Sequence, residues 1–267
     1  MIVRTPDGAV GLDASGAGEP VLLLHGFPLD RTLWAPQLAD PAPGFRYLAP
    51  DLPGFGESDR VAGPGMDRWA DWVVSLLDTL GIARATIGGL SMGGYLAMAC
   101  WRRHPHRVRG LVLADTRAGA DSDEGRAKRR EMQALLRTEG IEAVVERMRP
   151  GMTGRATRRL RPAAIDALDA MMRRAHPDAV HDALQALMDR PDSTATIASV
   201  TVPTLILCGD QDILTPLPES RAMQAAIAGS VLGVVPEAGH ASNFEVPGVF
   251  NRLLSEFLGA NIRADQS

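Results

Sequence analysis

Short apolar runs separated by amphipathic segments set the pattern of the first and last parts of the chain. Each run is too short for a helix and is apolar on both faces, as buried parallel strands are. The runs that predict strands are Val21–Leu24, Phe45–Ala49, Ala85–Ile87, Val108–Ala114, Thr204–Cys208 and Val231–Val235. We therefore expect one sheet whose strands are covered on both sides.

Helical spacing of apolar residues fills the intervals between these runs. The segments that predict helices are Met66–Leu80, Gly93–His104, Glu219–Ala228 and Gly248–Leu258. Strands that alternate with helices predict an α/β fold with a mostly parallel sheet and helices on both faces. Before the first run, Ile2–Leu12 is broken by Asp7-Gly8 and predicts an antiparallel hairpin at the sheet edge.

The alternation stops after Ala114 and resumes at Val202–Leu207. From residue 117 to residue 199 the apolar positions follow helical spacing alone, and prolines and glycines mark the expected helix ends. This pattern predicts a helical cap over residues 117–199. The cap is inserted into an α/β core that consists of residues 1–116 and 200–267.

Composition narrows the class of protein. The chain has 267 residues, of which 45% are hydrophobic, and a net charge of −4, so no basic surface for nucleic acid is expected. No signal peptide is visible, and no apolar stretch reaches the roughly 18–20 residues that span a membrane. Cys100 and Cys208 lie in apolar segments and are expected to be buried thiols. We expect a cytoplasmic monomer or small homo-oligomer that acts on a small molecule, away from nucleic acid and membranes.

A candidate nucleophile lies at Ser91, in the pattern G-x-S-x-G formed by Gly89-Leu90-Ser91-Met92-Gly93. The pattern alone is weak evidence, but here it follows a predicted strand and opens a predicted helix. Such a strand–turn–helix holds a serine in a strained conformation with its oxygen exposed. Glycines at both flanks remove Cβ atoms that would clash where strand and helix pack closely. The helix N-terminus also favours developing negative charge.

Two backbone N–H groups are needed to bind the oxyanion that forms when a serine attacks a carbonyl. Met92, directly after the serine, supplies one of them. Phe27 is the candidate for the other, because the loop His25-Gly26-Phe27 follows a strand expected to end beside Ser91. His25 lies too close to the strand end to act as the base and is expected to brace this loop.

The serine must lose its proton to a neutral imidazole that a carboxylate orients. His240 follows the last predicted strand, whose carboxyl end should face the same edge of the sheet as Ser91. His104 and His106 follow the helix after Ser91, and His176 and His181 lie on polar faces of the predicted cap. His240 is therefore the predicted base.

Three aspartates could orient this histidine. Asp212 lies just past a strand end and agrees with the chain order Ser, Asp, His. Asp210 could instead brace the turn, and Asp115 ends an earlier strand from which some hydrolases draw their acid. We predict Asp212 and keep the other two as alternatives. Asp51 and Glu245 are expected to hold the backbone N–H groups of nearby loops.

Five segments carry a resemblance to a known family. They are HGFPLD from His25, PDLPGFGESD from Pro50, GGLSMGGYLAM from Gly88, GDQDILTP from Gly209 and GHASNFEVP from Gly239. Together they resemble the α/β-hydrolase superfamily, and more narrowly bacterial carboxylesterases and 3-oxoadipate enol-lactonase-like proteins. The segment ADTRAGADSDEGRAKRR from Ala114 resembles the start of the cap in that esterase group.

The resemblance implies a catalytic triad of Ser91, Asp212 and His240, with Phe27 and Met92 at the oxyanion hole. It implies no metal and no cofactor. One departure is Pro53, where relatives often carry arginine, and Ser91 disfavours the haloalkane dehalogenases, which have an aspartate there.

These observations predict a serine carboxylesterase that acts on short-chain esters. The rival enzymes are a lactonase or enol-lactonase, a carbon–carbon bond hydrolase and an acyl transferase, and the rival outside catalysis is a ligand-binding homologue. The predicted cap holds six of the eleven methionines, and no aromatic residue lies between Trp101 and Phe244. A pocket roofed by this segment would deform easily and discriminate poorly between apolar groups.

Overall fold

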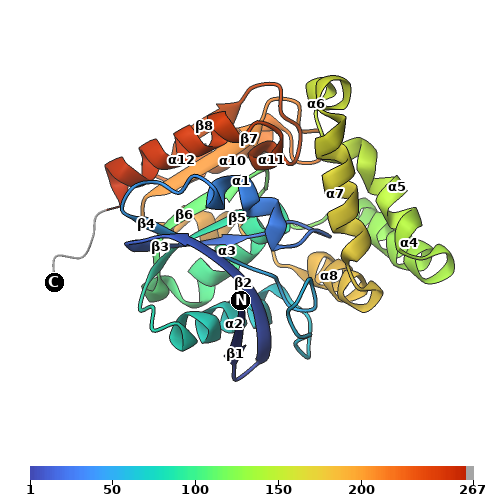
Figure 1. The fold of residues 1–267 in the computed structure, drawn as a ribbon, viewed down its shortest axis with the longest axis horizontal. Coiled ribbons are helices and arrows are strands. Elements are labelled where there is room, and N and C mark those ends of the chain that lie inside the picture. The colour runs from blue at the N-terminus through green and yellow to red at the C-terminus, as the bar shows by residue number, and fades with distance from the viewer. Residues whose placement is uncertain (263–267) are drawn as a thin grey trace.

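An eight-stranded sheet forms the centre of the molecule, in the order β1-β2-β4-β3-β5-β6-β7-β8 (Figure 1). The computed structural model describes residues 1–262. Strands β3 to β8 are parallel, while β2 pairs antiparallel with both β1 and β4. The strands are β1 Ile2–Thr5, β2 Gly8–Gly16, β3 Glu19–Leu24, β4 Phe45–Pro50, β5 Ala85–Leu90, β6 Val108–Ala114, β7 Thr204–Gly209 and β8 Val231–Val235. The predicted mostly parallel sheet is confirmed.

Two strands extend three or more residues beyond their predicted C-terminal ends. Strand β2 continues past Leu12 to Gly16, because its second half leaves the hairpin and pairs with β4. Strand β5 continues past Ile87 to Leu90, through Gly88 and Gly89. Glycine adds no apolar side chain to the pattern, yet β3 and β6 bind this backbone from both sides. The end of β5 is therefore set by backbone hydrogen bonds, which the pattern of hydrophobic residues does not reveal.

Helices cover both faces of the sheet. They are α1 Ala35–Leu38, α2 Met66–Thr79, α3 Met92–Arg103, α4 Asp123–Glu139, α5 Ile141–Met152, α6 Arg155–Leu160, α7 Pro162–Arg174, α8 Pro177–Asp189, α9 Thr194–Ala198, α10 Leu217–Ala226, α11 Ser242–Glu245 and α12 Pro247–Asn261. The four helices predicted in the core correspond to α2, α3, α10 and α12, with ends that differ by at most three residues. None of the helices in residues 1–262 is both long and apolar enough to cross a membrane.

Strand β3 shows how the two faces are filled. Leu22 and Leu24 point into a cluster with residues of α2 and α3, while Val21 and Leu23 pack with Trp34 and residues of α12 on the other face. Successive side chains of a strand point to opposite faces, so a continuous apolar run serves both layers. Each buried leucine contributes about 1.5–3 kcal/mol relative to an exposed one.

Six helices, α4 to α9, lie between β6 and β7 in the chain, and α4 to α8 stand on one side of the sheet in Figure 1. Residues 117–199 are all described, and they contain no strand, as the pattern predicted. Val180 and Leu184 of α8 are buried in the same apolar cluster as Phe55 of the core. Arg174 of α7 also pairs with Asp30 at 2.6 Å. The division of the chain into a core and a cap with boundaries at 117 and 199 stays a prediction.

Helix α3 approaches the sheet most closely in its first turn. A Cβ atom at Gly89 would overlap the backbone of Gly93, and one at Gly93 would overlap the carbonyl oxygen of Leu24. The backbones of β3, β5 and α3 therefore touch, and this close approach positions the turn at residue 91.

We expect Gly93→Ala to lower the free energy of unfolding by about 1–3 kcal/mol, because the added methyl group has no space. Gly259→Ala is the matched control, since that glycine also lies in a helix and nothing lies within 4 Å of an added Cβ. It should raise the free energy of unfolding by about 0.5–1 kcal/mol through helix propensity alone. Urea denaturation measures both values, and equal effects of the two substitutions would contradict the close approach.

Candidate active site

Ser91 occupies the turn between β5 and α3. Its backbone has φ 54° and ψ −110°, a left-handed conformation that costs a non-glycine residue about 1–3 kcal/mol. Two hydrogen bonds to the end of β6 hold it there. The Ser91 N–H donates to the carbonyl of Ala114 at 2.9 Å, and the Thr116 hydroxyl donates to the carbonyl of Ser91 at 2.9 Å. Ser91 is half-buried while its neighbours Leu90 and Met92 are buried, so it is the exposed point of the turn.

His240 and Asp212 form a buried pair. His240 lies in the loop after β8, Asp212 in the loop after β7, and Nδ1 of His240 lies 2.8 Å from Oδ2 of Asp212. Both residues are 4% exposed. Burial lowers the pKa of His240, but the charge of Asp212 and its hydrogen bond outweigh burial, so the pKa is raised from its usual 6.5. With Nδ1 bound to a carboxylate, Nε2 is the ring nitrogen left to exchange a proton.

The Asp212 carboxylate is held by its own loop. Oδ1 accepts N–H groups from Leu214 at 2.8 Å and Thr215 at 3.1 Å, and Oδ2 accepts the Thr215 hydroxyl at 2.6 Å. Burial raises the pKa of Asp212, but the charge of His240 and these hydrogen bonds lower it to about 2. The carboxylate is therefore ionised at neutral pH. Sequence reasoning missed Thr215, although a threonine three residues after an aspartate is a familiar local hydrogen-bonding pattern.

The other two aspartates do not contact His240. Asp115 is fully buried, and its carboxylate accepts the Gly209 N–H at 2.8 Å and the hydroxyl of Ser242. Burial and the nearby charge of Asp212 raise its pKa well above the usual value. Asp210 is exposed. The geometry thus separates the three candidates, since Asp212 alone among them binds the imidazole.

The loop after β3 lies against the turn at Ser91. A Cβ atom at Gly26 would lie 3.1 Å from Leu90 Cδ2 and 3.5 Å from Ser91 Cβ, so the backbone that leads to Phe27 passes beside the serine. His25 is fully buried, and its ring nitrogens bind the Gly26 carbonyl at 2.9 Å and the Leu52 N–H at 2.9 Å. These bonds brace the loop and leave His25 no free nitrogen, as its expected role requires.

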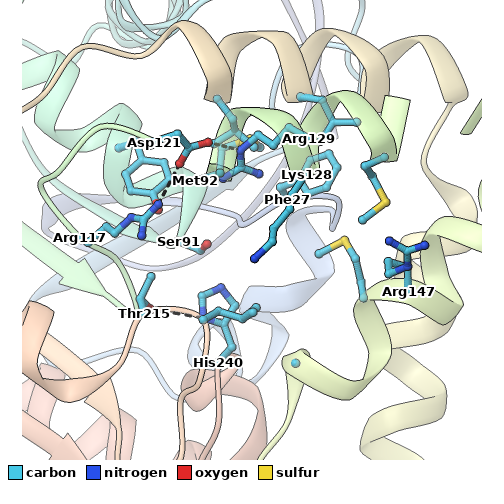
Figure 2. A pocket seen from close by; sticks show the side chains of 18 of the residues that line it. Phe27, Ser91, Met92, Arg117, Asp121, Lys128, Arg129, Arg147, Thr215 and His240 are labelled. Carbon is cyan, nitrogen blue, oxygen red and sulfur yellow. Dashed lines mark hydrogen bonds and ion pairs between the residues drawn. The ribbon is translucent and has the colours of Figure 1, made fainter. Parts of the chain in front are cut away.

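A pocket of about 730 Å³ brings these groups together. Phe27, Ser91, Met92, Thr215 and His240 line it from the core. Figure 2 shows Ser91 and His240 at the same cavity, with Thr215 beside the imidazole. The apolar wall from the helical segment comprises Met132, Met148, Leu184 and Leu187. Such a volume is typical of sites for small organic molecules. The remaining methionines of the segment, Met152, Met171, Met172 and Met188, are buried, and the first three share an apolar cluster with residues of the core such as Trp34.

Cationic side chains from the helical segment also face the pocket, namely Arg117, Lys128, Arg129 and Arg147 (Figure 2). Asp121 organises two of them. This nearly buried carboxylate binds Arg117 at 2.8 Å, Arg129, and also Arg190 at 2.7 Å from outside the pocket. Three guanidinium groups share this carboxylate. Glu124, which pairs with Lys128 at 2.7 Å, and Glu131 also line the pocket, so four cations outnumber three carboxylates there. No pattern in the sequence pointed to Asp121 as the carboxylate that gathers these arginines.

One cluster in the described residues has ligand atoms close enough to hold a metal ion, namely Asp115, Cys208 and Asp212. Its donors do not suit a metal. Both carboxylates already accept the hydrogen bonds described above, and burial raises the pKa of the Cys208 thiol to about 12. A metal needs the thiolate form. We therefore assign this cluster to the support of the Asp212 loop.

Comparisons with known proteins agree with this architecture. The family described as alpha/beta hydrolase fold matches residues 19–247. A solved thermophilic esterase from Thermogutta terrifontis, with malate bound, is 38% identical, covers 97% of this chain and 98% of its own, and superposes with a TM-score of 0.93. The enol-lactonase from Burkholderia xenovorans LB400 is 26% identical over 97% of this chain and 100% of its own, with a TM-score of 0.89.

A curated relative from Klebsiella pneumoniae, a 2-hydroxy-6-oxononadienedioate/2-hydroxy-6-oxononatrienedioate hydrolase, is 32% identical over 92% of this chain and 89% of its own. The family match spans most of the chain, and the relatives are similar over nearly their whole length. The chain is a hydrolase that belongs to the α/β-hydrolase fold family.

Proposed function

We propose that this protein hydrolyses carboxylic esters, with Ser91 as nucleophile, His240 as base and Asp212 as the acid that orients the base. The observation that carries the proposal is the buried His240–Asp212 pair on the wall of the pocket to which the strained Ser91 is exposed. Burial of two ionisable groups costs free energy. A base and the acid that orients it need such a pair, whereas a protein that only binds a ligand does not. The similarity to a solved esterase supports the choice of esters.

The reaction proceeds through an acyl-enzyme. His240 Nε2 takes the proton of Ser91 Oγ as this oxygen attacks the ester carbonyl, and the carbonyl oxygen becomes an anion. The N–H groups of Phe27 and Met92 bind that anion, and Met92 begins α3, whose dipole adds to the stabilisation. The imidazolium then gives its proton to the departing alkoxide, which leaves as the alcohol.

The second half repeats the chemistry with water. His240 takes a proton from water, the hydroxide attacks the acyl carbon, and the carbonyl reforms as the bond to Ser91 Oγ breaks. The imidazolium returns its proton to Ser91, so the products are the carboxylic acid and the free enzyme. Asp212 stays ionised throughout and stabilises the imidazolium at each stage. All steps use side chains and N–H groups of the chain itself.

A specific observation favours a second candidate, the lactonase activity. The cations Arg117, Lys128, Arg129 and Arg147 face the pocket, where they could bind a carboxylate carried by the substrate. The enol-lactonase neighbour and the relative named for a dioate substrate agree with such a group. The same triad opens a lactone by the same steps, and the leaving alkoxide then stays attached to the acyl chain.

We also propose that residues 117–199 act as the cap of this site. Methionine and leucine side chains of this segment roof the pocket, and their walls adapt to varied alcohol groups. On the acyl side, Phe27 and Met92 bring bulky side chains close to the reacting carbon.

Ser91 should be the acylated residue. Treatment with a fluorophosphonate, followed by mass spectrometry, should place the adduct on Ser91, since its hydroxyl is the one that a base activates. Ser91→Ala should remove both the adduct and hydrolysis of nitrophenyl acetate, while it leaves the thermal unfolding curve cooperative. An adduct on another serine, or persistent turnover by Ser91→Ala, would sink the proposal.

Asp212→Asn should lower kcat by several orders of magnitude, about ten-thousand-fold as in serine proteases, because the asparagine favours the wrong imidazole tautomer. Activity needs neutral His240, so kcat/KM falls as pH drops through the raised pKa of this residue. The residual activity of Asp212→Asn should persist to lower pH, since the charge that raises that pKa is gone.

Asp115→Asn should stay within about tenfold of the wild type, because Asp115 acts through one backbone and one hydroxyl hydrogen bond. A greater loss in Asp115→Asn than in Asp212→Asn would move the acid to Asp115.

Specificity constants for nitrophenyl esters should peak at about two to six acyl carbons and fall by eight to ten. Each methylene gains about 0.8 kcal/mol where it finds an apolar slot, and nothing once the chain meets a closed wall. A rise that continues to twelve carbons would indicate an open groove.

Simple lactones and an enol-lactone that carries a carboxylate belong in the same series. Failure of all simple esters beside fast turnover of the enol-lactone would establish the second candidate.

A further inference from the structure

Three segments meet next to His240. They are the turn between α5 and α6 at Gly154, the end of β7 at Gly209, and the base loop, which is the loop after β8 that carries Gly239 and His240. A Cβ atom on Gly154 would lie 2.9 Å from the Gly239 nitrogen, and one on Gly209 would overlap the Gly239 carbonyl. The base loop is therefore enclosed between the core and the helical segment, with backbone against backbone.

Glu245 joins two of these turns through its carboxylate. It ends helix α11, is 2% exposed, and folds back so that Oε1 accepts the Gly239 N–H at 2.7 Å. Its Oε2 accepts the Gly154 N–H at 2.7 Å. One side chain thus binds the residue directly before His240 and the turn that follows α5.

Further bonds tie the same partners. The Ala241 N–H donates to the carbonyl of Met152 at 3.1 Å, and Arg161 donates to the carbonyl of Glu245. Ala241, directly after His240, is therefore bound to the helical segment, and Gly239, directly before it, is linked to the segment through Glu245. Helix α5 also supplies Arg147, Met148 and Gly151 to the pocket, so the helix that contacts the substrate is tied to the base.

The charge of Glu245 acts on His240 as well. Besides Asp212, which binds the imidazole, Asp115 and Glu245 also raise the pKa of His240 through space. Burial raises the pKa of Glu245 above its usual value, and the nearby Thr157 hydroxyl and the N–H groups of Gly154 and Gly239 oppose this only in part. Ionised Glu245 would stabilise the imidazolium that forms in each half of the reaction.

We propose that Glu245 is a positioning residue for His240 that couples the α5–α6 turn of the helical segment to the base of the active site. The inference rests on the proposed function, in which His240 is the base. It goes beyond that function because it gives the helical segment a part in catalysis besides roofing the pocket.

Two substitutions separate geometry from charge. Glu245→Gln keeps the shape but removes the charge, and its NH₂ group must face one of the two backbone N–H groups. We expect kcat to fall about 10-fold to 100-fold, with KM within about twofold, because a buried hydrogen bond to a charged group is lost. The acid limb of kcat/KM should move to lower pH, since one carboxylate no longer raises the pKa of His240.

Glu245→Asp keeps the charge but is too short to bind both N–H groups. Its kcat should fall by a similar factor while the acid limb stays in place. Gly154→Ala disturbs the same contact from the helical segment without touching Glu245, and should lower kcat several-fold with the acid limb unmoved. Glu237→Gln is the matched control, because it removes an exposed charge three residues from His240 and should change neither quantity.

All rates are divided by the fraction of Ser91 that a fluorophosphonate labels, so that misfolded protein does not count. A Glu245→Gln enzyme whose kcat stays within twofold of the wild type, or whose acid limb does not move, overturns the inference. If that variant yields no labelled protein, Gly154→Ala decides, and a kcat within twofold of the wild type overturns it. Failure of wild-type Ser91 to label would refute the proposed function instead, before any of these variants is compared.

Discussion

The register of the parallel strands is the constraint on which the site depends. Backbone pairing aligns Leu24 with Gly89, Leu90 with Ala114, Ala114 with Leu207, and Gly209 with Val235. Strands β3, β5, β6, β7 and β8 therefore end at one edge of the sheet, and each is followed by a loop that carries a group of the site. The chain also changes direction along the sheet here, because β4 and β5 lie on opposite sides of β3. A crevice opens at such a point, and ligands of α/β proteins bind there.

The buried carboxyl groups behind the site accept most of their hydrogen bonds from backbone N–H groups and hydroxyls. Asp115 binds Gly209 N–H and Ser242, Asp212 binds the N–H groups of its own loop, and Glu245 binds Gly239 and Gly154. Removal of a carboxylate from water costs several kcal/mol unless hydrogen bonds replace the lost hydration. Because the bonds of Asp115 and Glu245 also join separate segments of the chain, these two carboxyl groups fix the positions of the loops as well.

The helical segment contributes a chemistry that the core lacks. The core side of the pocket holds the uncharged contacts around Ser91, while the segment brings methionines together with a corner of guanidinium groups gathered by Asp121. The apolar wall can adapt to a part of the substrate that varies. The localised excess of positive charge suits a part that is anionic. This division of roles explains why both an ester and a carboxylate-bearing lactone are reasonable substrates for one triad.

The sequence by itself determined the order of strands and helices, the place of the helical insertion, and Ser91, Asp212 and His240 as candidates, because these depend on local periodicity, motif and chain order. It could not separate Asp212 from Asp115 by physical argument, since both follow strands that end at the same edge. The tertiary structure shows that, of these two, Asp212 is the one hydrogen-bonded to His240, at 2.8 Å. It also revealed the grouping of arginines around Asp121 and the bond of Glu245 to Gly154, which lies 91 residues away in the chain. Contacts between distant segments depend on how helices and strands pack against one another. Neighbouring residues in the chain do not determine them, so the periodicity of a single sequence does not predict them.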